Sequence, residues 1–187
     1  TVQQLLPEVR LHIYGSAIPD SLIELASDRV VIGGHVADLA VAFDRHRVSI
    51  APLRFGAGFK GKLAASLAHG VPSVVTPIGA EGTGLNDGEH VLVAEDAVTF
   101  AAAIVYLYNN EPLWRRLARS GLQFVREQFS SEMAKRHFRE ILAKVNWPAQ
   151  PLETFSEMAP ASNPSPDCLG PARFPSGPGR IEQEYIR

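Results

Sequence analysis

Short apolar runs that end in glycine or proline-rich turns alternate with segments of helical periodicity along the first hundred residues. The runs at 9–15 (VRLHIYG), 30–34 (VVIGG) and 48–53 (VSIAPL) are apolar on both faces. Strands of this kind, separated by helices, are typical of a parallel sheet that is covered by helices on both sides. The sequence therefore predicts an α/β fold with a parallel sheet and helices on both faces.

The same alternation predicts the remaining elements. Beyond residue 97 the pattern is helical, and Pro112 suits the first turn of a helix. The expected helices are 20–27, 37–46, 60–69, 97–110, 112–130 and 131–145, and the further expected strands are 73–76 and 90–95.

Composition indicates one globular domain followed by a tail. The chain has 187 residues, of which 45% are hydrophobic and 20% charged, with a net charge of −2. This is enough to bury a core, and the near-neutral charge disfavours a nucleic-acid partner. Eight of the 14 prolines lie at or beyond residue 148. We therefore predict a domain over 1–147 and a Pro-rich extended or disordered tail over 148–187.

Several classes of protein are disfavoured. The single cysteine, Cys168, leaves no internal disulfide framework and fits a reducing compartment. No apolar run approaches the ~20 residues that a transmembrane helix needs. The first ten residues resemble neither a signal peptide nor a transit peptide, and because they lack an initiator Met we expect a fragment or a processed product. The six histidines show no ligand spacing, so we predict no metal site.

Glycine and positive charge gather where strands are expected to end. In open parallel sheets ligands bind at the carboxyl ends of the strands, and the expected ends at 15–16, 33–36, 53–58 and 77–84 all contain glycine. Glycines let a ligand approach the main chain, and a helix start presents N–H groups to an anion. Arg54, Lys60 and Lys62 add phosphate-binding charge. These residues predict an anionic, phosphate-bearing ligand.

The residues alone leave an alternative open. Glycine is common at strand-to-helix turns for steric reasons, and lysines at a helix start are usually solvated. The segment 56–62 (GAGFKGK) matches neither the Walker pattern nor G-x-G-x-x-G.

The order of the segments resembles the C-terminal, donor-binding half of the GT-B glycosyltransferases of group 1, also called family 4. The resemblance covers roughly residues 5–145. Its most specific part is a G-x-K-x-K pattern followed by A-x-G-x-P-x-V-x-T-x-x-G-x-E-G. The matching segments are 9–16, 30–36, 50–82 and 87–96, the third reading IAPLRFGAGFKGKLAASLAHGVPSVVTPIGAEG.

This resemblance implies a Rossmann-like fold and a nucleotide-diphosphate sugar as the donor. The sugar would be moved to an unknown acceptor, which is a saccharide, a lipid-linked molecule or a protein. The family uses no dinucleotide, and we expect no metal because basic residues and backbone N–H groups neutralise the leaving diphosphate. A cytoplasmic location is expected because nucleotide-sugars are made there, with no transmembrane segment but with peripheral membrane contact left open.

The resemblance also assigns roles to residues of this chain. Arg54, Lys60 and Lys62 would face the diphosphate, Glu81 would accept sugar hydroxyls, and Val36 would lie near the base. The backbone of two short segments would line the sugar and the phosphates; these are Gly56, Ala57 and Gly58, and Gly79, Ala80, Glu81 and Gly82. The catalytic residues are unknown, since a catalytic His, where the family uses one, belongs to the other domain.

The chain departs from the family pattern in two ways. Ala57 and Ala65 stand where the family often has glutamates, and the second of these normally binds the ribose hydroxyls of the donor. The N-terminal acceptor domain and the opening strand of this domain are absent, so we expect the chain alone to be inactive. Two alternatives follow: a non-catalytic nucleotide-binding or scaffold module, and a nucleotide-sugar epimerase of the same GT-B fold.

Overall fold

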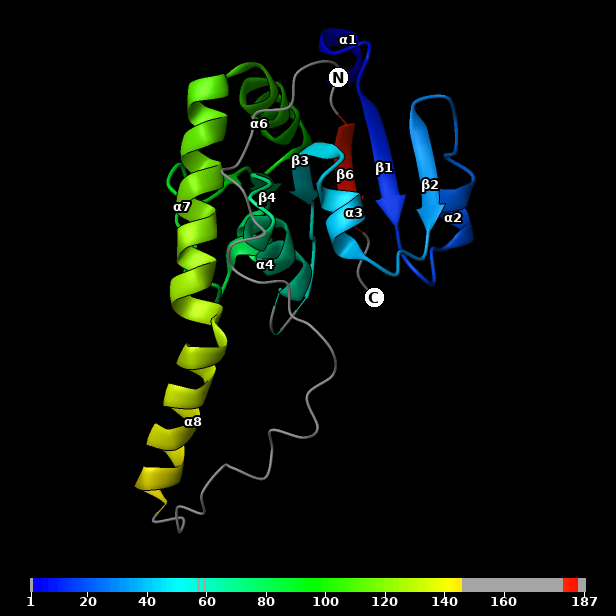
Figure 1. Cartoon of the computed structure of the whole chain (residues 1–187). Coiled ribbons are helices and arrows are strands. Elements are labelled where there is room, and N and C mark those ends of the chain that lie inside the picture. Colours follow the sequence, from blue (N-terminus) through cyan, green and yellow to red (C-terminus); the bar gives the residue numbers. More distant parts are fainter. Residues whose placement is uncertain (1, 57, 59, 146–179, 185–187) are drawn as a thin grey trace.

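The computed structural model contains one six-stranded sheet in which all neighbouring strands are parallel (Figure 1). It describes residues 2–56, 58, 60–145 and 180–184. The order of the strands is β2-β1-β6-β3-β4-β5. This confirms the predicted α/β class with a parallel sheet. The strands are β1 (Arg10–Tyr14), β2 (Val30–Gly34), β3 (His46–Ala51), β4 (Ser73–Val75), β5 (Leu92–Val93) and β6 (Arg180–Glu184).

The predicted helices form, mostly with shorter bounds. Two further helices of four residues each, α1 and α5, were not predicted, because one turn is too short to show a helical period. The helices are α1 (Val2–Leu5), α2 (Asp20–Ile23), α3 (Leu39–Phe43), α4 (Gly61–Ala68), α5 (Pro77–Ala80), α6 (Ala97–Asn109), α7 (Glu111–Phe129) and α8 (Ser131–Lys144).

The strands bury apolar side chains on both faces of the sheet. Since successive residues of a strand point to opposite faces, Val74 joins one core cluster and Val75 joins another. The first cluster includes Ile104 of α6, and the second includes Leu67 of α4. Each face is thus closed by its own helix, as a parallel sheet requires.

α7 is anchored to the sheet by a buried hydrogen bond. Trp114 Nε1 donates to the carbonyl oxygen of Arg47 in β3, at 2.6 Å. The guanidinium of Arg47 lies 4.5 Å from the ring centroid of Tyr108 in α6, and burial lowers the pKa of Arg47. One residue of β3 therefore contacts two helices, α6 and α7, that lie far from it in the sequence.

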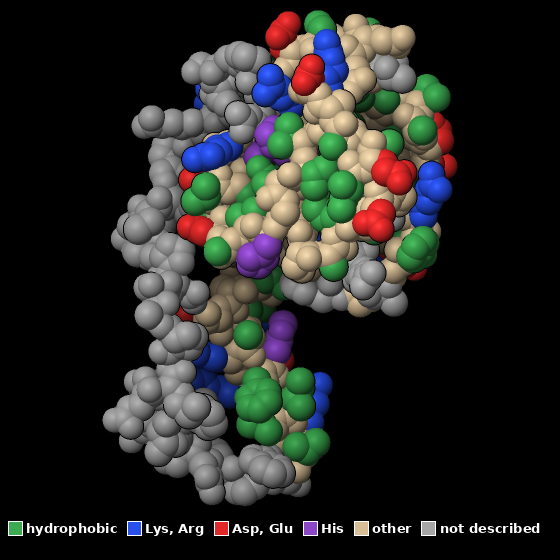
Figure 2. Space-filling model, turned by 90° about the vertical axis from the view of Figure 1, so that its right-hand side faces the viewer, with side chains coloured by type: hydrophobic (Ala, Val, Ile, Leu, Met, Phe, Trp, Pro, Cys, Tyr) green, Lys and Arg blue, Asp and Glu red, His purple; other side chains and the backbone are tan. Residues whose placement is uncertain are grey.

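α8 extends from the body of the domain and buries none of its residues. Phe138, Ile141 and Val145 are more than half exposed. Hydrophobic and basic side chains appear together on this lower part of the molecule (Figure 2). Of the helices that the structure describes, none has the length and apolar character of a membrane span.

β6 comes from the segment that was predicted to be a tail. Its five residues, Arg180–Glu184, lie between β1 and β3. The sequence RIEQE contains one apolar residue, so no buried-strand pattern revealed it. The division of the chain at residue 147 stays a prediction, because 146–179 lie outside the described residues.

Candidate functional site

A cavity of about 510 Å³ lies beyond the carboxyl ends of β3 and β4. Two chain segments form most of its wall: the loop that follows β3 and the loop that follows α5. Five of the predicted binding residues are brought together here, along with Thr83 and Phe129. The predicted residues that line the cavity are Gly56, Gly58, Lys60, Glu81 and Gly82.

Lys60 is the most unusual residue of the cavity wall. Its side chain is only 7% exposed, and Nζ donates to the carbonyl oxygens of Gly56 and Gly58, each at 3.3 Å. Both glycines have positive φ (148° and 85°), which other residues rarely adopt. A lysine ammonium has three N–H donors, of which these carbonyls use two. Lys60 thus closes the glycine turn and places a positive charge beside the cavity.

The amino end of α4 adds to this positive potential. The first backbone bond of the helix runs from the N–H of Ala64 to the carbonyl of Lys60, so the N–H groups of Gly61, Lys62 and Leu63 have no acceptor within the helix. The helix dipole is positive at this end. The positive end of the α4 dipole and the charge of Lys60 therefore lie together next to the cavity.

Two predicted residues, Lys62 and Gly79, do not line this cavity. Lys62 and Gly79 line a void of about 10 Å³, room for no more than about one water molecule. A Cβ at Gly79 would lie 3.3 Å from the carbonyl oxygen of Ala51 and 3.2 Å from Cβ of Val75. Glycine at this position therefore lets α5 pack closely on the sheet.

Arg54 is exposed and lines a different cavity of about 340 Å³. That cavity also contains the carboxyl-bearing residues Glu95 and Asp96. Arg54 therefore shares its cavity with two acidic residues and does not line the 510 Å³ cavity.

Two other predicted residues that the structure describes, Ala80 and Val36, do not line the 510 Å³ cavity. Ala80 packs against the second core cluster. Val36 is half-buried beyond β2. Ala57 lies outside the described residues. Thr83 and Phe129 also line the 510 Å³ cavity. They were not predicted, because they carry no charge and belong to no binding motif.

Thr76 links the two loops of the site and was also missed. Its Oγ1 donates to the carbonyl oxygen of Leu53 at 2.6 Å and accepts from the backbone N–H of Gly79 at 3.2 Å. The second bond caps α5, and a threonine directly before a proline is a recognisable helix start. The first bond holds the β3 loop against α5, which no local pattern could reveal.

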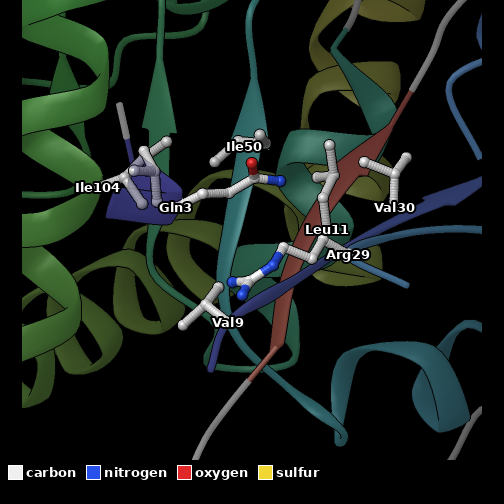
Figure 3. A pocket seen from close by; sticks show the side chains of 8 residues that line it. Gln3, Val9, Leu11, Arg29, Val30, Ile50 and Ile104 are labelled. Atoms are coloured by element: carbon white, nitrogen blue, oxygen red, sulfur yellow. The ribbon is translucent and has the colours of Figure 1, made fainter. Parts of the chain in front are cut away.

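An apolar cavity of about 230 Å³ lies between α1, α6 and the sheet (Figure 3). Its lining is aliphatic apart from Gln3 and Arg29, and Arg29 donates to the carbonyl oxygen of Pro7. It shares Val2, Ile50 and Ile104 with the 340 Å³ cavity. Its lining lacks the glycine backbone and the buried lysine that distinguish the 510 Å³ cavity.

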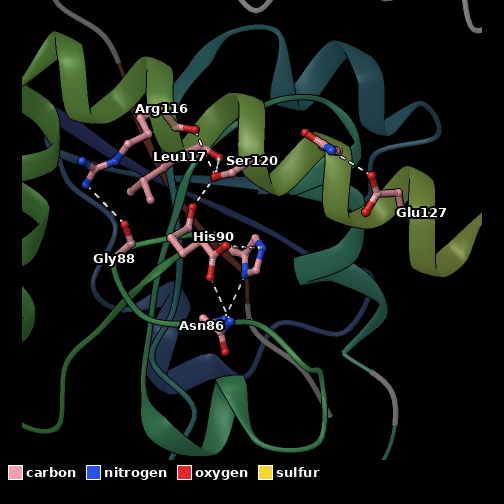
Figure 4. A network of polar contacts seen from close by, with 9 residues as sticks. Asn86, Gly88, His90, Arg116, Leu117, Ser120 and Glu127 are labelled. Carbon is pink, nitrogen blue, oxygen red and sulfur yellow. Dashed lines mark hydrogen bonds and ion pairs between the residues drawn. The ribbon is translucent and has the colours of Figure 1, made fainter.

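The loop between α5 and β5 is fastened to α7 by polar contacts (Figure 4). His90 Nδ1 accepts the backbone N–H of Asn86 at 3.0 Å, so the proton of the neutral ring is on Nε2. Arg116 donates to the carbonyl of Gly88, and Ser120 to that of Glu89. These contacts hold the loop against α7. Among the described residues, no three His, Cys, Asp or Glu side chains are grouped to hold a metal.

Comparison with known sequences identifies relatives of the chain. The model of a family described as "Glycosyl transferases group 1" matches residues 1–110. An uncharacterised 44.6 kDa protein of the cps region of Klebsiella pneumoniae is 29% identical over 135 residues, which are 67% of this chain. The chain covers 35% of that protein, so it spans about a third of the length of this relative.

Solved structures share the fold. Sucrose-phosphate synthase from Thermosynechococcus elongatus has a TM-score of 0.62 at 19% identity, over 79% of this chain and 43% of the enzyme. HepE from Anabaena, in complex with UDP and glucose, has a TM-score of 0.64 at 14% identity, over 75% of this chain and 44% of HepE.

A third structure is the C-terminal domain of a group 1 glycosyl transferase family protein, LpcC from Francisella tularensis. It is 12% identical, with a TM-score of 0.53, and the match covers 70% of this chain and 94% of that domain. The chain therefore has the fold of the C-terminal domain of a GT-B protein.

Proposed function

Since the chain belongs to the group 1 glycosyl transferase family, we propose that its 510 Å³ cavity binds the nucleotide-diphosphate sugar donor of a sugar-transfer reaction. The observation that carries this proposal is the buried Lys60, whose ammonium lies against the turn of Gly56 and Gly58 next to the amino end of α4. Backbone N–H groups, glycine and a fixed positive charge are the features that bind phosphate groups.

In this proposal the diphosphate lies over the first turn of α4. Its negative charge grows as the bond to the sugar breaks, and Lys60 and the helix end stabilise the diphosphate as it leaves. Because Lys60 is already held by two carbonyls, its charge needs no reorganisation when that negative charge develops. Lys62, in the first turn of α4, adds a second positive charge.

The sugar lies toward the second loop of the cavity. Glu81 is exposed at the end of α5, and its carboxylate accepts hydrogen bonds from sugar hydroxyls. The ring of Phe129 supplies an apolar surface for the carbon face of the sugar. HepE, which has the same fold, was solved with UDP and glucose, and this supports a ligand of the same chemical class here.

The acceptor and the transfer step belong to a longer protein in this proposal, because the chain spans about a third of its relative. Sugar transfer requires that donor and acceptor be held together and shielded from water. The reaction is placed in the cytoplasm, where nucleotide-sugars are made.

Calorimetric titration of the 187-residue chain tests the proposal. UDP, GDP and ADP are each compared with the corresponding nucleoside. We expect one diphosphate to bind at least roughly ten-fold more tightly than its nucleoside, because charge-assisted hydrogen bonds contribute ~1.5–3 kcal/mol each. Equal affinity for diphosphate and nucleoside, or no binding of any nucleotide, would reject a donor site and leave a scaffold module.

A further inference from the structure

The loop between α5 and β5 and the end of α7 form two walls of the 510 Å³ cavity. Glu81, Gly82 and Thr83 belong to the loop, whereas Phe129 is the last residue of α7. The two walls lie far apart in the sequence. The spacing between them therefore depends on the contacts that hold the loop against the helix.

Phe124 of α7 lies between the loop and Phe129. Its ring centroid is 6.1 Å from that of Phe129, with the ring planes at 63°, and 4.7 Å from that of His90. A Cβ at Gly84 would lie only 3.3 Å from Phe124 Cζ, so the backbone of the loop passes directly beside the same ring. Edge-to-face and tilted pairs are favourable arrangements of aromatic rings. Three rings thus connect the far end of the loop, at His90, with the cavity.

His90 closes the loop by hydrogen bonds to Asn86 (Figure 4). Nδ1 accepts the backbone N–H of Asn86 at 3.0 Å, and the backbone N–H of His90 donates to the carbonyl oxygen of Asn86, also at 3.0 Å. A neutral imidazole has a single acceptor nitrogen, and the first of these bonds uses it. The side chain of His90 is only 12% exposed. The imidazole is therefore held in place between the loop and α7.

The hydrogen bonds continue from the closed end of the loop to the cavity. Leu85 donates its N–H to Oγ1 of Thr83 at 3.2 Å, and Thr83 Oγ1 donates to the carbonyl oxygen of Ala80 at 2.6 Å. Leu85 also packs against the second core cluster. Only Gly84 and Leu85 separate Asn86 from Thr83, so the position of Asn86 constrains that of the cavity wall.

We propose that His90 is a positioning residue of the 510 Å³ cavity. It is not among the residues that line the cavity. Its Nδ1 closes the loop at Asn86, and the closed loop rests on Phe124, so that the loop wall keeps a constant spacing from Phe129. In the proposed donor site these two walls enclose the sugar, and that consequence alone rests on the proposed function.

The test compares His90→Ala with His90→Asn in the full 187-residue chain. Alanine removes the acceptor, whereas asparagine offers Oδ1, which is bonded to Cγ as Nδ1 is. In His90→Ala we expect the Asn86 amide to exchange its hydrogen at least roughly ten-fold faster than in the wild type. In His90→Asn we expect exchange within about three-fold of the wild type. His137→Ala, on the exposed surface of α8, is the matched control and should exchange like the wild type.

A nuclear Overhauser contact between Gly84 and the ring of Phe124 reports whether the loop rests on α7. We expect this contact in the wild type and in His90→Asn, and its loss in His90→Ala. Retention of the contact in His90→Ala would overturn the proposal, because the loop would then be positioned without His90. Loss in both variants would also overturn it, because the acceptor at residue 90 would not be what positions the loop.

Protection of the amides of α6 and α7 shows whether a variant is folded. If His90→Ala loses this protection as well, it has unfolded, and His90→Asn then decides the question. A folded His90→Asn variant with the Gly84–Phe124 contact supports the proposal, and a variant without the contact overturns it.

None of these measurements involves a nucleotide. Failure of every nucleotide to bind would reject the donor site but not the role of His90. Unchanged exchange with a retained contact in His90→Ala would reject the role of His90, whichever nucleotide binds.

Discussion

Lys60 combines two properties that lysines seldom share. It is almost fully buried, and its ammonium contacts backbone carbonyl oxygens. These contacts close the turn of Gly56 and Gly58. In the proposed donor site the same ammonium also attracts the diphosphate, so binding and loop structure would depend on one side chain.

Lys60→Met is expected to weaken UDP binding by at least roughly ten-fold, because it removes a charge-assisted contact worth ~1.5–3 kcal/mol. Uridine affinity should change little, since the nucleoside lacks phosphates. Calorimetry with both ligands measures the difference, and Lys144→Met on the exposed end of α8 is the control. Arg54→Ala should have a smaller effect than Lys60→Met, because Arg54 lines another cavity. Parallel losses for UDP and uridine would mean that Lys60 acts only on the fold of the loop.

Ala65 stands where the family often has a glutamate that binds the ribose of the donor. A substitution at Ala65 therefore tests the resemblance to the family. Ala65 lies three residues after Lys62 on α4 and is half-buried. A glutamate there could accept hydrogen bonds from ribose hydroxyls, each contributing ~1.5–3 kcal/mol. Ala65→Glu is therefore expected to tighten UDP binding about ten-fold and to leave the 2′,3′-dideoxy analogue nearly unchanged. A lower melting temperature without any gain for UDP would show that Ala65 is a packing residue, since the carboxylate would then be buried without partners.

At the scale of elements, single polar contacts help to position α6 and α7, which share the first core cluster. Asp96 begins α6: its carboxylate accepts from the N–H groups of Val98 and Thr99, and Thr99 Oγ1 accepts the N–H of Asp96 in return. α7 is positioned by the bond from Trp114 to Arg47. The cap at Asp96 lies outside the apolar core, whereas Trp114 is itself a member of the first core cluster.

The cap of α6 should make stability depend on pH. Hydrogen bonds from the backbone of Thr99 and Val98 lower the pKa of Asp96 in the folded protein. The charged carboxylate thus stabilises the fold above its ordinary pKa of about 3.9, and this contribution is lost as the pH falls through the lower folded-state value. Asp96→Asn, which does not titrate, should melt below the wild type at pH 7, with a difference that shrinks below about pH 4.

Thermal melts across this pH range measure the effect of the cap. Asp96→Ala removes the acceptor as well as the charge, so it should melt below Asp96→Asn at every pH. A constant difference between Asp96→Asn and the wild type would show that the carboxylate charge does not contribute.

Trp114→Phe should lower the free energy of unfolding by ~1–3 kcal/mol, because it leaves the buried carbonyl of Arg47 without its donor. Urea denaturation measures this change. Tyr106→Phe, on the exposed side of α6, is the control and should stay within about 0.5 kcal/mol of the wild type. Equal stability of the two variants would mean that the carbonyl finds another donor.

At the scale of the whole molecule, the 510 Å³ cavity lies beyond the carboxyl ends of β3 and β4, in a sheet where β6 joins β1 and β3. β3 pairs with β6 and leads directly into the loop of the cavity. In the proposed function this arrangement positions the donor, and other parts of a longer protein hold the acceptor.

The purified chain is accordingly expected to bind a nucleoside diphosphate without transferring sugar from any nucleotide-sugar to water or to a saccharide. Transfer needs a second wall that orients the acceptor and excludes water. Release of UDP, GDP or ADP from the corresponding nucleotide-sugars can be followed with a coupled assay. Sustained release by the chain alone would contradict this expectation and would place the catalytic groups within these 187 residues.

Local patterns were sufficient for most of the fold. Strand and helix periods arise from backbone geometry within a few residues, so the sequence alone predicted the parallel α/β class and the positions of most elements before residue 145. It also predicted part of the cavity wall, because the carboxyl ends of β3 and β4 must lie at the same edge of a parallel sheet. Gly56, Lys60 and Glu81 were found in this way.

The remaining features depend on contacts between distant segments. The bond from Thr76 to Leu53, the presence of Phe129 in the cavity and the separation of Arg54 from it follow from how loops and helices pack. β6 is the clearest case. The position between β1 and β3 can be filled by any segment of the chain that pairs with both strands. The segment that fills it, Arg180–Glu184, has one apolar residue, so its local sequence did not indicate a buried strand.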